Sequence, residues 1–306
     1  MAGATAPVFT SDIADGLKLT LDQVIDDNLS NYKAKSVFPK WTTQSNMSDN
    51  FEDDLEMGGP GLAAEKSEGA EMQAGGIQEG ALTRYIARTF ALKLVVTEEA
   101  VEDSKYDQII AAASRLPRAL WKTADIDCTN MLSRATNTAY VGGDGQPLAS
   151  ATHTLPSGGT FSNLMAVPMS PSRIAVATAT TQMRKFPGHD GITEGAEPEL
   201  AIYPQEQWYI WDGLRMSEKN PESGNFNEIN IVNKLGLEGV PVKYWTNTTT
   251  NWGLISAVDN GFKFKWRRKP RSRSWVDNDQ EIMKYGISAR WARGWSDPRC
   301  ILFVNA

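Results

Sequence analysis

Apolar residues recur at steps of three and four along the middle of the chain, a spacing that places them on one face of a helix. This pattern predicts a long amphipathic helix within the stretch from Thr97 to Thr136. Its apolar positions are Ile109, Ala113, Leu116, Leu120, Ala124, Cys128, Met131 or Leu132, and Ala135.

The ends of this helix are marked by polar residues. Ser104 and Asp107 have the spacing of a capping box, so we expect the main helix to begin at Ser104, after a short acidic turn. Pro117 lacks a backbone N–H and is predicted to bend the helix, at a cost of about 3 kcal/mol unless packing absorbs it. At about 1.5 Å per residue the helix would span roughly 45 Å, which is longer than a compact domain of this size needs to be wide. We therefore expect the other elements to pack around it.

The first forty residues predict a single amphipathic helix, from about Leu19 to Tyr32. A helix of this length cannot bury its apolar stripe alone, so we expect it to dock on another surface. The next stretch, Trp41–Gly80, is rich in glycine and acids and is predicted to be a long loop. Alternating apolar residues over Ala81–Val96 then predict one long strand, an arm of a projecting hairpin whose partner surface lies outside the subunit.

The second half of the chain predicts an α/β lobe followed by a strand-rich end. A turn-rich stretch, Tyr140–Asn163, comes first, and Gly142–Gly145 within it is expected to be a plain turn. The predicted elements are helix Pro171–Lys185 with Ser170 as N-cap, strand Leu200–Tyr203, helix Pro204–Ser217, strands Ile229–Val232 and Val240–Thr246, and strands from Trp252 onward, interrupted near Lys269-Pro270 and turning near Asp277-Asn278-Asp279.

Charge is distributed unevenly. The 306 residues carry a net charge of −6 with a pI near 5.2, which does not fit a typical nucleic-acid-binding domain. The stretch Glu52–Glu79 holds eight acids and one lysine, whereas Lys263–Arg273 holds seven basic residues and no acid. This asymmetry indicates either a contact with an oppositely charged partner, including another copy, or two solvated faces.

Residues suited to catalysis are few. His153 and His189 lie in loop contexts, Cys128 and Cys300 lack the close ligand pairs of a zinc site, and no metalloprotease or nucleophile-elbow motif occurs, so we expect no catalytic, cofactor or metal residues. Two cysteines cannot make a disulfide framework, and a reducing compartment is the simplest expectation. We also expect no signal peptide and no membrane contact, since no long apolar run occurs.

Two other patterns allow a functional and a structural interpretation. Asp277, Asp279 and Glu281 alternate as in calcium loops but lack the glycine and distal glutamate, which favours a charged hairpin tip. In Gly261–Trp275, aromatic residues alternate with basic ones. Exposed, such a strand would bind single-stranded nucleic acid; we prefer a strand whose aromatic face is core and whose basic face meets solvent or another subunit.

Four segments make the chain resemble the major capsid proteins of tailed bacteriophages, which share the Hong Kong 97 fold, and within them the branch of the major head subunit of phage Mu. The segments are ARTFALKLVVTEEAVEDSKYDQII at the entry to the long helix, DGQPLASATHTLPSGGTFSN after it, PELAIYPQEQWYIWDGLRMSEKNP, and the closing SARWARGWSDPRCILFVNA.

The resemblance implies an α+β fold with four parts. Residues 1–40 would form an N-terminal arm and 41–96 an extended β-hairpin loop. Residues 97–145 and 255–295 would form a peripheral domain around the long helix, called the spine in that family. Residues 146–254 and 296–306 would form an axial α/β domain.

The function implied is that of a non-enzymatic shell protein that assembles in the host cytoplasm into the icosahedral virion capsid around double-stranded DNA. Its partners would be other copies, in hexamers and pentamers joined through the arm and the loop, together with a separate scaffolding protein, a portal, a decoration protein and non-specifically packaged DNA. From the charge asymmetry we expect the contact between copies to use Glu52, Asp53, Asp54, Glu56, Arg267, Arg268, Lys269, Arg271 and Arg273.

Some family chemistry has no match in the chain. We find no lysine, asparagine and glutamate set like the one that cross-links one member covalently, so we expect non-covalent shells, and no maturation cleavage is evident. Two alternatives stay open: an encapsulin-type shell, which shares the fold but encloses enzymes, and a single-stranded nucleic-acid-binding protein.

Overall fold

The computed structural model describes residues 10–97, 99–100, 103, 106–220, 224, 228–245, 250–257, 261–277 and 282–305, with side chains from residue 21 onward except that of Tyr106. The chain divides into two compact units, which we describe separately. The first comprises residues 1–36, 87–125 and 266–291, and the second comprises residues 37–86, 126–265 and 292–306. The four-part organisation expected from the sequence is finer than this division and stays a prediction.

Three antiparallel strands in the order β10-β11-β4 run through the first unit. They are β4 (Arg88–Thr97), β10 (Phe262–Asp277) and β11 (Ile282–Trp295), and β11 pairs with β4 from Ile282↔Thr97 to Trp291↔Arg88. Pro270 does not interrupt β10, contrary to the prediction. The other neighbour of β10 in the sheet is β1 (Thr43–Asn46), which has only four residues against sixteen in β10, so β1 leaves most of that side of β10 uncovered and a missing N–H is tolerated there. The turn expected near Asp277 lies mostly outside the described residues.

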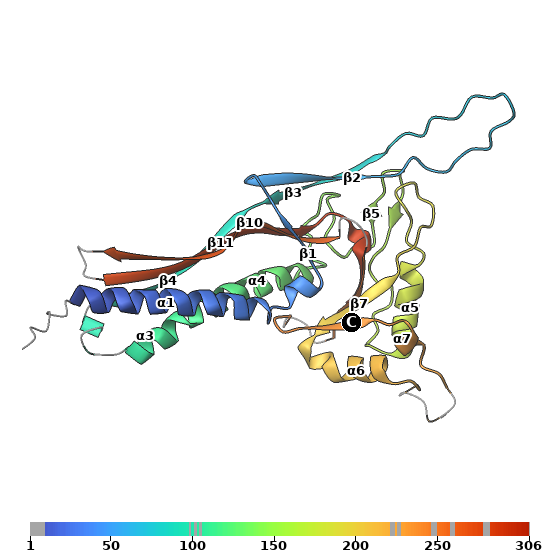
Figure 1. Cartoon of the computed structure of the whole chain (residues 1–306). Helices are drawn as coiled ribbons and strands as arrows, with labels where there is room; N and C mark the ends of the chain where they lie inside the picture. Colours follow the sequence, from blue (N-terminus) through green and yellow to red (C-terminus); the bar gives the residue numbers. More distant parts are fainter. Residues whose placement is uncertain are drawn as a thin grey trace, which may run out of the picture. The chain divides into compact units, whose positions relative to one another are not determined.

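Helix α1 (Thr10–Lys33) packs along this sheet (Figure 1). It begins earlier than the predicted Leu19, and its side chains Leu21 and Ile25 are fully buried. Ser272 of β10 donates to Asp26 at 2.9 Å, and the Trp121 indole donates to the Leu29 carbonyl at 3.0 Å. The helix therefore docks its stripe within the unit, as an amphipathic helix of this length requires.

The predicted long helix is two helices, α3 (Tyr106–Ala113) and α4 (Arg115–Ser133), separated at Ser114. Pro117 lies in the first turn of α4, where backbone N–H groups make no hydrogen bond within the helix, so its missing N–H costs nothing there. The helix therefore breaks before the proline instead of bending at it. All the apolar positions predicted from Ile109 to Ala135 are buried. The predicted cap residue Ser104 lies outside the described residues.

In the second unit, β2 (Phe51–Met57) and β3 (Glu79–Ile86) pair as an antiparallel hairpin, joined by a long exposed loop that projects beyond them (Figure 1). The predicted hairpin is therefore present, and its paired part extends into the stretch expected to be loop. The predicted single strand Ala81–Val96 is wrong: it divides at Ala87, because β3 pairs with β2 whereas β4 pairs with β11.

The rest of the second unit is an α/β lobe built on a four-stranded sheet in the order β12-β9-β7-β8. Its core stacks Tyr203 on Trp211, with ring centroids 5.1 Å apart, and sets Trp252 edge-on to Trp211. The elements are β7 (Pro198–Pro204), β8 (Glu238–Val242), β9 (Trp252–Ser256), β12 (Ile301–Val304), α5 (Arg173–Met183), α6 (Trp208–Met216) and α7 (Ile231–Lys234), with short strands β1 (Thr43–Asn46), β5 (His153–Thr154) and β6 (Thr160–Phe161) and 3-10 turns η1 (Phe38–Lys40), η2 (Gln205–Gln207) and η3 (Pro298–Cys300).

Two local predictions in this lobe are wrong. Helix α5 is capped by Ser172, whose hydroxyl accepts from the Ala175 N–H, and not by Ser170. The predicted strand Ile229–Val232 instead begins helix α7, because Asn230 caps it through the Val232 N–H. Asn230 also donates to the carbonyls of Leu214 and Ser217. Asn230 thus bonds to backbone groups at the end of α6 and at the start of α7. These hydrogen bonds outweigh the β propensity of Ile229 and Ile231.

Candidate functional site

The β2–β3 hairpin has two different faces. On one face, cross-strand pairs Phe51–Ile86 and Leu55–Leu82 flank the ion pair of Asp53 with Arg84. The four apolar side chains are 37 to 57% exposed. On the other face lie Glu52, Asp54 and Glu56, which alternate with them along the strand.

Asp54 lies at the centre of an ion cluster beneath the hairpin. Its carboxylate accepts from Lys263 at 2.7 Å and from Lys265 at 2.9 Å, and Glu52 contacts Lys265 at 3.2 Å. The Lys265 ammonium also lies 4.6 Å from the centre of the Tyr85 ring. Burial acts to raise the pKa of Asp54, but the two lysines outweigh it and hold the pKa below its usual value.

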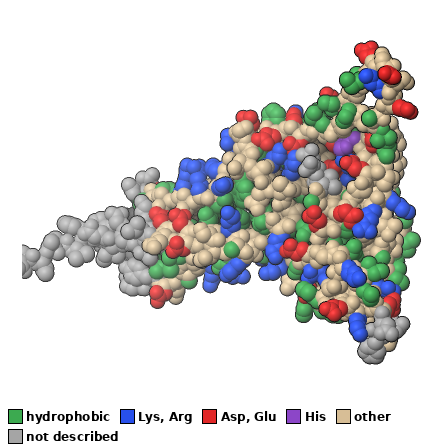
Figure 2. Space-filling view, turned by 45° about the vertical axis from the view of Figure 1, so that its right-hand side comes forward, with side chains coloured by type: hydrophobic (Ala, Val, Ile, Leu, Met, Phe, Trp, Pro, Cys, Tyr) green, Lys and Arg blue, Asp and Glu red, His purple; other side chains and the backbone are tan. Residues whose placement is uncertain are grey.

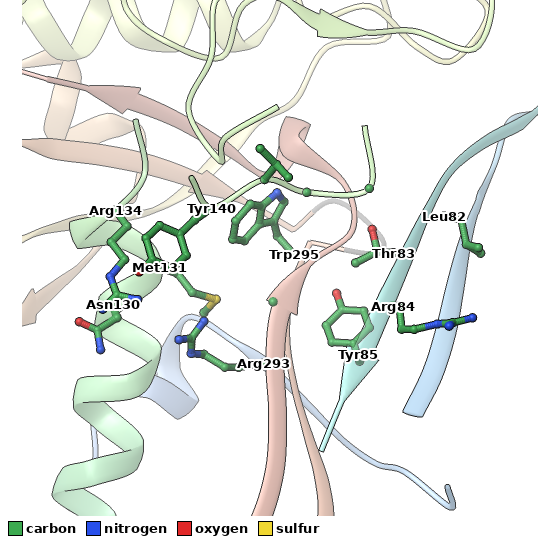
Figure 3. A pocket seen from close by; sticks show the side chains of 14 residues that line it. Leu82, Thr83, Arg84, Tyr85, Asn130, Met131, Arg134, Tyr140, Arg293 and Trp295 are labelled. Carbon is green, nitrogen blue, oxygen red and sulfur yellow. The ribbon is translucent and has the colours of Figure 1, made fainter. Parts of the chain in front are cut away.

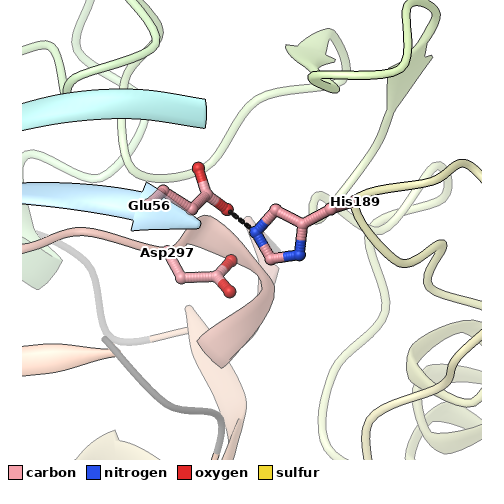
Figure 4. Close-up of side chains that lie close together, drawn as sticks. All are labelled: Glu56, His189 and Asp297. Atoms are coloured by element: carbon pink, nitrogen blue, oxygen red, sulfur yellow. Dashed lines mark ion pairs between the residues drawn. The ribbon is translucent and has the colours of Figure 1, made fainter. Parts of the chain in front are cut away.

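Glu56 meets a second cluster at the end of β2 (Figure 4). Its carboxylate lies 2.7 Å from Nε2 of His189, and Asp297 lies close to both. Burial and the Asp297 carboxylate raise the pKa of Glu56 against the opposing charges of His189 and Arg299. The four groups join the hairpin to the loop around His189 and to η3.

Glu56, His189 and Asp297 have ligand atoms within 4.8 Å of one another, the spacing of a metal site. Arg299 already supplies a cation there. One of its terminal nitrogens lies 2.6 Å from Asp297, 3.1 Å from His189 Nε2 and 3.7 Å from Glu56. The cluster is therefore compensated by a guanidinium, and its donors do not favour a metal ion.

Each predicted acidic residue thus has an ionic partner inside the chain. Asp53 accepts two hydrogen bonds from Arg84, and this contact lowers the pKa of the Asp53 carboxyl. The predicted basic residues are placed differently. Arg268 donates to Ser288 at 2.9 Å, and burial together with neighbouring arginines lowers its pKa. Among the residues described, no acid pairs with the other four, which are exposed; these are Arg267, Lys269, Arg271 and Arg273.

Three of the four aromatic residues of β10 are part of the core, whereas Trp275 near its end is 43% exposed. Phe262, Phe264 and Trp266 are 0 to 6% exposed. In the first unit, Trp266 packs edge-on against Trp121 and Trp291. The predicted core position of these three aromatic residues is confirmed, and their rings are not accessible for stacking on bases. The basic face differs from the expectation at Lys265, which is buried and pairs with Glu52 and Asp54 of the same chain.

Sequence reasoning missed a cavity of about 270 Å³ at the root of the hairpin. Figure 3 shows Arg134, which directly follows α4, at one side of it and Thr83 on β3 at the other, with Tyr140, Arg293 and Trp295 also lining it. The lining residues come from four separate stretches of sequence, so no local motif identifies them.

A buried polar network around His153 was also missed. The imidazole is 0% exposed; Nδ1 lies 2.6 Å from Asp144 in the Gly142–Gly145 turn, and Nε2 lies 3.1 Å from Asn163 Oδ1. Asn163 donates to the carbonyls of Leu148 and Pro298. Cys128 and Cys300 are buried free thiols, and burial raises the pKa of Cys300 well above its usual value.

The fold is shared with solved shell structures at low sequence identity. A Microbacterium phage Oxtober96 chain matches with a TM-score of 0.57 and 10% identity, over 88% of this chain and 90% of that one. The capsid of cyanophage P-SCSP1u matches at 0.56 and 11%, over 88% and 87%, and a virus-like particle from Pyrococcus furiosus at 0.55 and 8%, over 94% and 98%. The chain therefore has the Hong Kong 97 type of capsid fold.

The family model described as phage capsid protein matches residues 81–304. The chain belongs to this family and is a structural protein of a phage capsid shell. A search of curated proteins gives no match. No helix in the part of the chain that the structure describes is long and apolar enough to cross a membrane.

Proposed function

We propose that the protein is the major head protein of a tailed phage, assembling through hexamers and pentamers into an icosahedral shell around double-stranded DNA. The exposed apolar face of the hairpin carries this proposal. Phe51, Leu55, Met57, Leu82 and Ile86 are 37 to 58% exposed on a two-stranded ribbon, a structure that is marginal in water by itself. Burial against neighbouring copies removes this surface from water, as a shell requires.

The contacts between copies use the N-terminal arm, the hairpin loop and the predicted charged residues. Arg267, Lys269, Arg271 and Arg273 support this role, since they are exposed and no acid among the described residues pairs with them. The predicted acidic residues already have ionic partners in their own chain, so a contact with another copy would have to share the same carboxylates. These residues are Glu52, Asp53, Asp54 and Glu56. The charged contact therefore depends chiefly on the basic side.

The remaining partners follow from the proposed role. A separate scaffolding protein would direct assembly in the host cytoplasm, a portal would admit the DNA, and a decoration protein would bind the finished virion. The chain's own role is structural and not enzymatic. Its packaged DNA would be held without sequence preference.

Electron microscopy of the purified protein, paired with light scattering, tests the proposal. We expect closed shells, formed alone or with the scaffolding protein of the same phage. Shells recovered from infected cells should contain nuclease-protected double-stranded DNA. Shells filled with an enzyme would instead support the encapsulin alternative, and a protein that stays dispersed with its scaffold present would contradict a shell function.

A further inference from the structure

The cavity at the hairpin root is lined by basic and apolar side chains. Its lining includes three arginines, Arg84, Arg134 and Arg293, and no acidic residue. Arg84 pairs with Asp53, and a terminal nitrogen of Arg293 pairs with Asp127 at 2.9 Å. Arg134 is half-buried and stacks on Tyr140, 4.4 Å from the ring centre, with no acidic partner among the residues described.

Two buried polar atoms in the lining have no hydrogen-bond partner within the part of the chain that the structure describes. They are Nε of Arg293, a donor, and Oγ1 of Thr83. A buried polar atom without a partner costs about 1–3 kcal/mol, so such atoms are normally satisfied by a ligand, water or another chain. Together with the unpaired Arg134 guanidinium, they indicate that the cavity accepts an anionic group.

The rest of the lining decides what kind of anion fits. Leu82, Met131, Val141 and Trp295 give the cavity an apolar wall, and Val141 and Leu82 are each 51% exposed. A phosphodiester backbone is best bound by an open row of basic groups. A cavity that opens to the surface beside apolar side chains suits a carboxylate side chain carried by a peptide with apolar residues next to it.

The chain itself contains such a peptide. The hairpin loop between Met57 and Glu79 carries Glu65, Glu68 and Glu71, all exposed and without an ion pair among the described residues. Its apolar side chains Leu62 and Met72 are each 78% exposed. Figure 2 shows acidic and hydrophobic side chains together on this projecting tip.

We infer that the cavity lined by Arg134, Arg293 and Thr83 receives the acidic loop of a second copy, with a glutamate carboxylate of that loop bound by the two arginines. The inference rests on the proposed shell function and names the surfaces that meet. This contact is separate from the proposed contact through the basic residues of β10 and from the ion pairs formed by the acids of β2, because no residue of β10 or β2 lines the cavity. Arg134 and the loop acids can pair because none of them forms an ion pair with another described residue.

Charge exchange tests this pairing in the assembly assay above. The variants are Arg134→Glu, the triple loop variant Glu65→Lys, Glu68→Lys and Glu71→Lys, and the combination of all four. Arg118→Glu, at an exposed position of α4, the helix that Arg134 directly follows, is the matched control. We expect each of the first two to lower shell yield at least tenfold, the combination to restore most of it, and the control to assemble like the wild type.

The other outcomes are equally informative. Normal shells from Arg134→Glu would overturn the site, and normal shells that package less DNA would assign the arginine to phosphate. Two defective variants without rescue in the combination would overturn the loop as occupant. An unfolding temperature of dispersed Arg134→Glu equal to that of the wild type would exclude misfolding as the cause of its defect. Wild-type protein in the same assay separates the two proposals: shells from the wild type show that the shell function holds even where the pairing fails.

Discussion

Asp54 of the hairpin accepts a hydrogen bond of 2.9 Å from the ammonium group of Lys265, a residue only 5% exposed. A buried ammonium is strongly unfavourable unless a charge partner lies beside it. Asp54 thus fixes the position of the hairpin root as well as compensating Lys265. The acidic face of β2 anchors the hairpin within the chain, and the opposite, apolar face is exposed and is the one we propose to meet other copies.

Replacing Asp54 by Ala should destabilise the protein by about 3–5 kcal/mol, because it leaves Lys263 and Lys265 without their shared carboxylate. Chemical denaturation of the dispersed protein measures this change. Asp53→Ala is the matched control on the opposite face, where the pair with Arg84 is exposed to solvent and contributes little. Equal losses from the two variants would contradict an anchoring role specific to Asp54.

Glu56 should make stability depend on pH in the acidic range. Burial and Asp297 raise its pKa in the folded state above the unfolded value near 4.5, so folding favours the protonated form. The stability of the wild type relative to Glu56→Gln should therefore rise as pH falls from neutral through the raised pKa toward about 4.5. Unfolding temperatures of both proteins across this range give the difference, and a difference that shrinks with acidification would refute the assignment.

Tyr285 should contribute to alkaline unfolding. Burial first, and the nearby Asp22 carboxylate second, raise its pKa to about 12 from an ordinary value of 10.0. The unfolded chain loses this proton first, so the stability it contributes is present below pH 10 and lost as pH rises toward 12. Tyr285→Phe should lose less stability over that interval than the wild type does. Tyr209→Phe, with a ring 64% exposed, is the control and should behave like the wild type.

The sequence predicted the elements whose signal is local. The helical spacing from Ile109 to Ala135 reports one buried face, and that face is buried throughout. The alternation in β10 likewise identified Phe264 and Trp266 as core. The break at Ser114 was missed because the same periodicity continues across it, and only the position of Pro117 in the first turn of α4 explains it.

The candidate sites depend on long-range contacts and were predictable only in part. Charge asymmetry led us to expect the acids near Asp54 to meet the basic stretch of another copy; the structure pairs Asp54 with Lys265 within one chain, and the contact between copies stays a prediction. The cavity beside Arg134 draws on residues up to about 200 positions apart, and nothing in the local pattern brings them together. His153 occurs in a turn-rich stretch whose composition predicts exposure, yet it is fully buried.

That burial leads to the last prediction. Both ring nitrogens of His153 face oxygen acceptors, the Asp144 carboxylate and Oδ1 of Asn163. The Asn163 orientation is fixed, because its amide nitrogen donates to two carbonyls and its oxygen accepts from the Ser150 N–H. Replacing His153 by Phe removes the ring nitrogens that face both acceptors and leaves the Asp144 carboxylate, with a side chain only 7% exposed, without its imidazole partner and with the Gln146 N–H as its remaining hydrogen-bond donor.

We expect His153→Phe to lower the free energy of unfolding by about 3–5 kcal/mol, the range for a buried charge left unpaired. Chemical denaturation should show a lower midpoint with an unchanged slope, as for a loss of stability without a change in the surface exposed. Thr154→Ala, at an exposed position of the same short strand, is the control and should change the midpoint little. The double variant His153→Phe with Asp144→Leu, which also removes the unpaired charge, should recover part of the loss; no recovery would show that packing of the ring, and not the charge on Asp144, makes His153 necessary.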